Sequence, residues 1–209
     1  MQEPADVRIC FFGDSFVNGT GDDDCLGWVG RICAAARCRG LDLTSYNLGV
    51  RRDTSADIAE RWRREAEARL PPQFDGRLVF SFGANDCASE PDGAPRLDFD
   101  QVLAYAETIL AEAREWRTTL MVGPPPIQDD GPASRRIDLL SSELASLCRR
   151  LGVPYFDAFR VVSVSARWRD EAAAGDGAHP NRNGYAELAE ALDRWPVWRQ
   201  WLVAPRRCP

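Results

Sequence analysis

Apolar and polar positions follow one another along this chain in a regular order, in which a short apolar run precedes a longer stretch of helical periodicity. The apolar runs predict five strands, at 7–13, 42–48, 77–82, 118–122 and 153–156. Strands that alternate with helices run parallel and are joined by right-handed crossovers. We therefore expect an α/β fold, a three-layer α/β/α sandwich around a five-stranded parallel sheet.

Between these runs, apolar residues recur at three- and four-residue steps, which is typical of helices that cover a sheet. The pattern predicts helices over 27–39, from a capping sequence at 54–57 to the Pro71-Pro72 stop, over 99–116, through 137–151 and over 183–194. The segment 158–175 is predicted to be partly helical. Since no internal repeat, linker or low-complexity segment interrupts the pattern, we expect a single domain over 1–209.

The last stretch, 195–209, is an aromatic extension that carries Trp195, Trp198 and Trp201. The simpler interpretation is that these rings pack on the body of the domain. The alternative is that they form a wall for an acyl chain or a contact in a dimer. Nothing else in the sequence indicates a homo-oligomer.

The composition is that of an ordinary globular protein, and the net charge of the chain disfavours negatively charged partners. Of 209 residues, 44% are hydrophobic and 28% charged, and the formal net charge is −6. An acidic chain argues against nucleic acid or an anionic membrane surface as a partner, because both bind basic faces. All 26 basic residues are arginine, so lysine Schiff-base chemistry and a Walker-type phosphate loop are excluded.

Other features predict a reduced, cytoplasmic protein without a membrane span. The N-terminal residues lack the pattern of a signal peptide, and no apolar run is long enough for a transmembrane helix. The seven cysteines are scattered without a C-x-x-C pair, and with one histidine this disfavours a zinc site. The spacing of Asp22, Asp23 and Asp24 matches no calcium loop, so we interpret them as solvated loop carboxylates.

Chemically active residues follow several of the predicted strands directly. Ser15 follows the first strand, Gly49 the second and Asn85 the third, and His179 lies in the loop beyond the fifth. The carboxyl ends of parallel strands meet at one edge of a sheet, where ligands bind. We therefore expect these residues to share one site.

Together these residues supply what ester hydrolysis needs. Ser15 is the candidate nucleophile, and His179, the one histidine of the chain, is the candidate base. Asp176, three residues before His179, can orient the imidazole and stabilise its protonated form. The backbone amides of Ser15 and Gly49 and the side-chain amide of Asn85 are candidate donors to the oxyanion.

Each residue also has an ordinary interpretation when it is taken alone. A serine after a strand is usually a helix cap, an Asn-Asp pair usually belongs to a turn, and a lone histidine in a loop is usually a surface residue. Taken together, Ser15, Gly49, Asn85 and His179 follow one another along the chain, each beyond the end of a strand. This combination favours a serine hydrolase.

The ordered set Gly13-Asp14-Ser15-Phe16, Gly49, Gly83-Ala84-Asn85-Asp86 and Asp176-x-x-His179 resembles the SGNH, or GDSL-type, family of esterases and lipases. The resemblance spans residues 7–192. It implies a flavodoxin-like sheet in the order 2-1-3-4-5, and hydrolysis of a small-molecule ester through an acyl-enzyme without metal or cofactor. It also implies Ser15, Asp176 and His179 as the catalytic triad, and Ser15, Gly49 and Asn85 as the oxyanion hole.

Two positions depart from the pattern of that family. Phe16 stands where the family's short name has leucine, an apolar exchange that we expect to matter little. Arg52 stands where many members have glycine. If the backbone there has a positive φ, arginine costs about 1 kcal/mol or more in strain, whereas a shifted turn avoids that cost. The G-x-S-x-G elbow of the α/β-hydrolases is missing from the sequence, which disfavours that other family.

Two other functions stay open on the sequence alone. An acyltransferase would use the same site and pass the acyl group to an alcohol. A catalytically silent binding module on the same fold would lack a triad member, and none is missing here. A nucleotide-binding fold is disfavoured, because the loop after the first strand has neither G-x-G-x-x-G nor G-x-x-x-x-G-K-[ST].

The loops expected to form the pocket rim, 16–26, 87–98 and 125–133, carry acidic residues and give no signal for a hydrophobic lid. We therefore expect a small, soluble or short-chain ester as substrate rather than a long-chain triglyceride. Arg51 and Arg52, close to Gly49, either face solvent, which is the simpler interpretation, or recognise an anionic group of the substrate.

Overall fold

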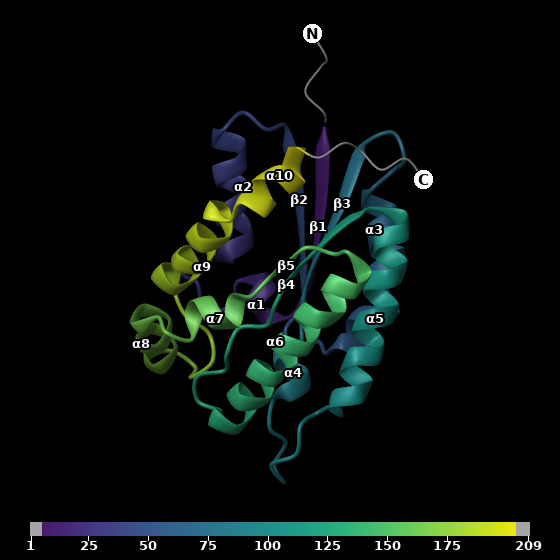
Figure 1. Cartoon of the computed structure of the whole chain (residues 1–209). Coiled ribbons are helices and arrows are strands. Elements are labelled where there is room, and N and C mark those ends of the chain that lie inside the picture. Colours follow the sequence, from purple (N-terminus) through teal and green to yellow (C-terminus); the bar gives the residue numbers. More distant parts are fainter. Residues whose placement is uncertain (1–5, 204–209) are drawn as a thin grey trace.

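The computed structural model describes residues 6–203 of the chain. Within this part, five strands form one all-parallel sheet in the order β2-β1-β3-β4-β5 (Figure 1). The strands are β1 (Val7–Gly13), β2 (Leu43–Gly49), β3 (Asp75–Ser81), β4 (Thr118–Val122) and β5 (Tyr155–Phe156). The predicted α/β fold and sheet order are confirmed, although the fifth strand is shorter than its apolar run suggested.

The helices fill the connections between these strands. They are α1 (Ser15–Asn18), α2 (Gly27–Cys38), α3 (Ser55–Arg69), α4 (Ala84–Cys87), α5 (Phe99–Trp116), α6 (Gly131–Leu151), α7 (Ala158–Val162), α8 (Ala166–Ala174), α9 (Arg182–Arg194) and α10 (Pro196–Val203). The long helices match their predicted ranges, except that α6 begins at Gly131, six residues before its predicted start at 137. The sequence analysis missed α1 and α4, because a single helical turn is too short to show a periodic pattern. It also missed α10, which lies in the stretch predicted only as an aromatic extension.

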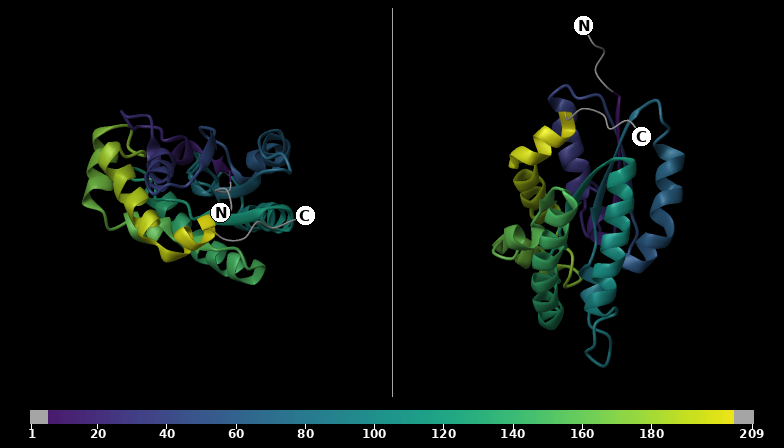
Figure 2. Two further views of the ribbon diagram at one scale, coloured as in Figure 1. Left: turned by 90° about the horizontal axis from the view of Figure 1, so that it is seen from above. Right: turned by 45° about the vertical axis from the view of Figure 1, so that its right-hand side comes forward.

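The helices cover the sheet on both faces. Right-handed crossovers in this strand order place α2 on one face and α3, α5 and α6 on the other, and α9, which follows the last strand, packs beside α2. In agreement, α2 contacts α9, α3 contacts α5 and α5 contacts α6. Figures 1 and 2 show α2 with α9, and α3 with α5, on opposite sides of the strands. The predicted three-layer sandwich is therefore present.

The middle of the sheet, β1 and β3, is covered on both faces, which explains the continuous apolar runs of these strands. Phe12 of β1 stacks on Phe80 of β3, with ring centroids 5.5 Å apart. Trp62 of α3 meets Phe80 edge-on, and Trp28 of α2 meets Phe11 in the same way. Aromatic contacts on both faces thus fix the strand that leads to Ser15.

The register of the parallel strands aligns their carboxyl ends. Gly13 of β1 pairs with Gly49 of β2 and with Ser81 of β3. The residues that follow these strands therefore emerge at one edge of the sheet, the lower edge in Figure 1, where α1 and α4 lie.

The end of the described chain packs on the body of the protein. Trp198 and Trp201 of α10 are buried, and their rings stack with centroids 5.4 Å apart. Trp195 lies 5.4 Å from the ring of Phe156 in β5. This agrees with the simpler interpretation of the aromatic cluster, and residues 204–209 of the extension lie outside the described residues.

Candidate active site

Ser15 lies at the turn from β1 into α1. The Asp14 carboxylate caps this helix by accepting the Phe16 N–H at 2.9 Å. Ser15 is only 5% exposed, and Asp14 is buried below it. Burial raises the pKa of Asp14 to about 7, because an apolar surrounding disfavours the charged carboxylate.

A chain of short contacts joins Ser15 to His179 and Asp176. The Ser15 Oγ lies 2.7 Å from His179 Nε2, and His179 Nδ1 lies 2.7 Å from Asp176 Oδ2. The Phe16 ring packs on the imidazole at a centroid distance of 4.7 Å. The structure thus brings together Ser15, His179 and Asp176, the three residues that the sequence analysis named as candidates for a triad.

The Asp176 carboxylate also fixes the backbone of this loop. Its Oδ1 accepts the N–H groups of Ala178 and His179, at 3.1 and 2.9 Å. Partial burial acts to raise the pKa of Asp176, but hydrogen bonds from the His179 backbone and imidazole outweigh it and lower the pKa to about 2. Asp176 is therefore a carboxylate at neutral pH and suited to stabilise an imidazolium.

The loop is anchored from α8 by Glu171. One carboxylate oxygen accepts the N–H groups of Asn181 and Gly184, at 2.9 and 2.8 Å. The other accepts the backbone and side-chain N–H groups of Asn183, at 3.1 and 2.7 Å. Glu171 thereby holds the start of α9, directly after His179. An anion is favourable there because helix amino ends carry unpaired N–H groups.

The loop between α1 and α2 touches His179 from the opposite side. Gly21 has φ +89°, and a Cβ atom there would lie 2.8 Å from the Pro180 carbonyl and 3.0 Å from His179 Cβ. Only glycine satisfies both the left-handed backbone and this close approach.

In the same loop, the prediction of three solvated carboxylates is wrong for Asp22. Asp22 is buried, pairs with Arg31 of α2 and accepts the Gly27 N–H at 2.8 Å. Asp24, which is partly exposed, pairs with Arg31 at 3.0 Å. Asp23 accepts a hydrogen bond from Asn181 at 2.8 Å. Arg31 lies on the following helix and Asn181 more than 150 residues away, so the local acidic run gave no sign of either partner.

The candidate oxyanion donors lie at the ends of β1, β2 and β3, with different partners. The Asn85 side-chain amide donates to the Asp53 carbonyl at 3.0 Å and keeps a second N–H. The Gly49 N–H donates to Asn47 Oδ1 at 3.0 Å. The N–H of Ser15 belongs to the first position of α1, where no carbonyl of the same helix can accept it.

Gly49 itself is required by packing. A Cβ atom at this position would lie 2.2 Å from the Asn18 N and 2.7 Å from the Asp14 carbonyl oxygen. Any side chain would push α1 away from the end of β2, and Ser15 lies on α1.

The turn after Gly49 contains the second departure from the family pattern. Arg52 has φ +73°, so the strained form of the turn is present and the shifted turn is not. The Asp53 N–H donates to the Val50 carbonyl at 3.2 Å and closes the turn. Arg96 donates to the Arg52 carbonyl at 2.9 Å. These contacts hold the unfavourable backbone in place.

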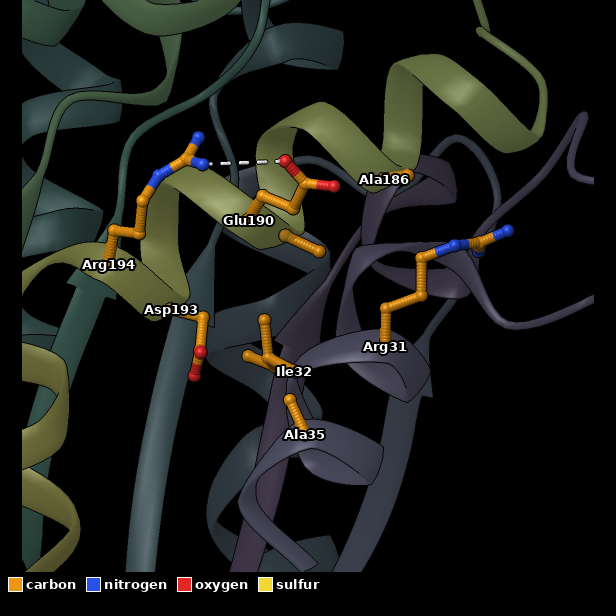
Figure 3. Close-up of a pocket in the computed structure, with 8 residues that line it drawn as sticks. Arg31, Ile32, Ala35, Ala186, Glu190, Asp193 and Arg194 are labelled. Atoms are coloured by element: carbon orange, nitrogen blue, oxygen red, sulfur yellow. Dashed lines mark ion pairs between the residues drawn. The ribbon is translucent and has the colours of Figure 1, made fainter. Parts of the chain in front are cut away.

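A pocket of about 490 Å³ lies beside His179. It is lined by the loop of Thr20 and Gly21, by Arg51, and by residues of the stretch 171–181 that include Asp176 and His179. A second pocket, of about 290 Å³, lies between α2 and α9 (Figure 3). None of the candidate catalytic residues lines the second pocket, so the pocket beside His179 is the candidate substrate pocket.

Two residues that organise the site escaped the sequence analysis. Asn47 lies two residues before Gly49, and this spacing is typical of an Asx turn, so a local signal for it existed. Glu171 lies in a segment whose pattern was ambiguous, and nothing near it in the sequence indicates its partners.

Two further findings concern ions and membranes. Among residues 6–203, no three His, Cys, Asp or Glu side chains gather in an arrangement that could hold a metal ion. None of the helices described has the length and apolar character needed to span a bilayer.

Comparison with known proteins identifies the family. The sequence model of the GDSL-like lipase/acylhydrolase family matches residues 11–187. Among curated proteins, none matches the chain significantly in sequence.

Solved structures with low sequence identity share the fold. The chain is similar to an acetylxylan esterase from Geobacillus stearothermophilus, with a TM-score of 0.75 and 18% identity over 98% of this chain and 100% of that chain. It is also similar to a lipase/acylhydrolase from Enterococcus faecalis, with a TM-score of 0.73 and 24% identity over 92% of this chain and 96% of that chain. Since the family match also covers most of the sequence, the chain belongs to the GDSL-like lipase/acylhydrolase family and is a serine hydrolase of ester bonds.

Proposed function

We propose that this protein hydrolyses small or short-chain carboxylic esters through an acyl-enzyme on Ser15, with His179 as the base and Asp176 as its orienting acid. The observation that carries the proposal is the unbroken contact from Ser15 Oγ to His179 Nε2 and from His179 Nδ1 to Asp176, each 2.7 Å long. Both distances lie within the range for proton transfer along a hydrogen bond.

In the first half of the reaction, Ser15 Oγ attacks the ester carbonyl carbon while its proton moves to His179 Nε2. The tetrahedral intermediate then collapses, and Nε2 returns the proton to the departing alcohol oxygen. In the second half, His179 takes a proton from water as the water attacks the acyl-enzyme, and Nε2 then returns that proton to Ser15 Oγ as the carboxylic acid leaves. Asp176 stabilises the imidazolium that forms in each half.

For the oxyanion we propose the N–H of Ser15, the N–H of Gly49 and the second side-chain N–H of Asn85. The Gly49 N–H must then exchange its Asn47 partner for the oxyanion, because an N–H engaged with Asn47 Oδ1 is not aimed at the substrate. Such donors typically stabilise the transition state by about 3 kcal/mol each.

The small acyl group is supported by relatives of the same fold. The Geobacillus stearothermophilus protein is an acetylxylan esterase, and its catalytic mutants replace a serine, an aspartate or a histidine by alanine. The exposed acidic residues near the catalytic loop, Asp23, Asp24 and Asp129, argue for a polar rather than a lipid substrate. An acyltransferase would use the same residues, and product analysis in the presence of an added alcohol distinguishes it.

The whole-chain organisation is part of the proposal. We propose a single domain, on the basis of one sheet and one continuous buried cluster that extends from Val7 to Leu202. A reducing, cytoplasmic location is likewise our proposal, and it is based on scattered cysteines, of which the six described are free thiols.

The test is hydrolysis of 4-nitrophenyl acetate and butyrate by wild type, Ser15→Ala and His179→Ala. We expect turnover by wild type and a loss of about 10⁴-fold or more in each variant, with unchanged folding by circular dichroism. A fluorophosphonate probe should label wild type and not Ser15→Ala. Equal activity of wild type and Ser15→Ala would refute the proposed mechanism.

A further inference from the structure

Arg51 is a charged residue at the candidate substrate pocket that has no partner of its own. Its side chain is exposed and lines the pocket beside His179. Within residues 6–203, its guanidinium makes no hydrogen bond and no ion pair, whereas Arg61, ten residues along the chain, binds Asp53 and two strand-end carbonyls. The donors of Arg51 are therefore available to a ligand.

The two carboxylates of the same pocket are already engaged. Glu171 accepts hydrogen bonds from the start of α9, and Asp176 accepts them from its own loop and from His179. Neither carboxylate pairs with Arg51, so the pocket offers a substrate one unpaired cation.

The position of His179 decides which part of an ester enters this pocket. The departing alcohol oxygen must receive its proton from Nε2, so the alcohol part of the substrate lies on the imidazole side of Ser15. His179 lines the pocket, whereas Ser15 and the candidate donors to the carbonyl oxygen, Gly49 and Asn85, do not. The pocket thus lies on the imidazole side of Ser15, which is the side of the alcohol part.

The backbone beneath Arg51 is fixed from several sides. The turn is closed by the Val50–Asp53 hydrogen bond, held by Arg96 at the Arg52 carbonyl and tied to Asn85 through the Asp53 carbonyl. The left-handed Arg52 backbone is part of this fixed turn. A fixed backbone means that little backbone entropy is lost when Arg51 binds a ligand.

We propose that Arg51 is a specificity residue that binds a carboxylate on the alcohol part of the ester substrate. A guanidinium presents a planar pair of N–H donors that matches the two oxygens of a carboxylate. This inference depends on the proposed serine-esterase function and adds to it the charge of the substrate and the side on which that charge lies.

The test compares two acetyl esters that differ in one group, 4-acetoxybenzoate and its neutral amide, 4-acetoxybenzamide. We expect Arg51→Gln to lower kcat/KM for the carboxylate about tenfold, as for one charge-assisted hydrogen bond at a partly exposed site, and to leave the amide unchanged. The matched control is Arg52→Gln, which removes an exposed arginine from the same turn outside the pocket and should affect neither ester. The wild-type KM for the carboxylate should also rise with salt, and that for the amide should not.

Other outcomes would overturn the inference in distinguishable ways. An equal loss on both esters would mean that Arg51 supports the turn rather than the carboxylate, and no loss on either would remove it from the site. A selective loss on mono-4-nitrophenyl succinate, whose carboxylate is on the acyl part, would refute the assignment of sides. If folded wild type hydrolyses none of these esters, the proposed function fails as well.

Discussion

The two ends of the parallel strands hold charged side chains in different ways. At the amino end, Arg77 of β3 pairs with Asp75 at 2.5 Å, with side-chain exposures of 1% and 7%, and lies 5.3 Å from the Trp201 ring of α10. At the carboxyl end, His179 pairs with Asp176 at 2.7 Å, but 47% of the Asp176 side chain is exposed. In Figure 1, α10 lies toward the upper end of the sheet and α1 toward the lower.

The charged side chains are buried at the amino end and accessible to a substrate at the carboxyl end. At the amino end, Asp75 and Arg77 are buried, and Arg77 lies against Trp201 of α10. These two residues therefore contribute to stability and to the packing of α10. At the carboxyl end, loops hold the charged groups beside a pocket, so their donors and acceptors can act on a substrate. We therefore expect substitutions at the first end to change unfolding, and substitutions at the second end to change mainly catalysis.

The largest effect is expected for Asp176→Asn, which keeps the size of the side chain but removes its charge. The imidazole loses its orientation and the stabilisation of its protonated form, so kcat should fall about 10²- to 10⁴-fold. The melting temperature should change by only a few degrees, since the side chain is half exposed. A loss below tenfold would remove Asp176 from the proposed triad.

At the other end, Arg77→Met should destabilise the protein by about 3–5 kcal/mol, because it leaves the Asp75 carboxylate buried without its partner. Urea unfolding measures this change. The double variant Asp75→Leu/Arg77→Met should regain most of the lost stability, since it removes both charges. The kcat/KM of the folded fraction should not change, and a large fall in it would break the distinction between the two ends.

The pH dependence of the free energy of unfolding tests Asp14, a buried acid at the carboxyl end of the strands. Its pKa is about 7 in the folded state, above the value of about 4 expected when unfolded, so the folded protein binds the extra proton between these values. Its contribution to stability is therefore fully present below about pH 4 and is lost as pH rises through 7.

The matching variant is Asp14→Asn, which cannot ionise. We expect it to be more stable than wild type by about 2–4 kcal/mol at pH 8 and similar to wild type near pH 4. Urea unfolding at several pH values checks this. A difference that is the same at both pH values would show that folding does not raise the pKa of Asp14.

Glu171→Gln tests whether the Glu171 carboxylate supports catalysis by holding His179 in place. The amide nitrogen would face two N–H groups that now donate to the carboxylate, so the start of α9 and the preceding loop should loosen. We expect kcat to fall about tenfold with little change in KM, because small displacements of a catalytic group reduce the rate more than binding. The control is Glu190→Gln, a substitution in the exposed part of α9. A change in KM alone would contradict a positioning role.

The smallest effect is expected for Arg52→Gly. Glycine relieves about 1–2 kcal/mol of left-handed strain, but part of this gain is offset by the greater freedom of the unfolded chain. The free energy of unfolding should rise by about 0.5–1 kcal/mol, with unchanged hydrolysis of neutral esters. A destabilised variant would show that the Arg52 side chain makes a contribution larger than the strain.

The amino-acid sequence by itself determined the strands, the long helices and the candidate catalytic residues, and its resemblance to the GDSL-type family implied the order of the strands in the sheet. Strands and long helices are visible because burial of one face imposes a period on neighbouring residues. Ser15, Asp176 and His179 are marked by their own short motifs, and the parallel sheet brings strand ends together whatever the details of packing. The contact between them was therefore predictable before any distance was known.

Only the tertiary structure decided which distant residues support these elements. Glu171 holds the start of α9, Arg31 of α2 neutralises the buried Asp22, and Arg77 meets Trp201 across more than half the chain. It also decided that Arg51 lines the pocket without a partner and that Arg52 adopts a left-handed backbone. Such pairings depend on where separate elements pack in space, and periodicity, which records only whether a residue is buried, does not specify the partner.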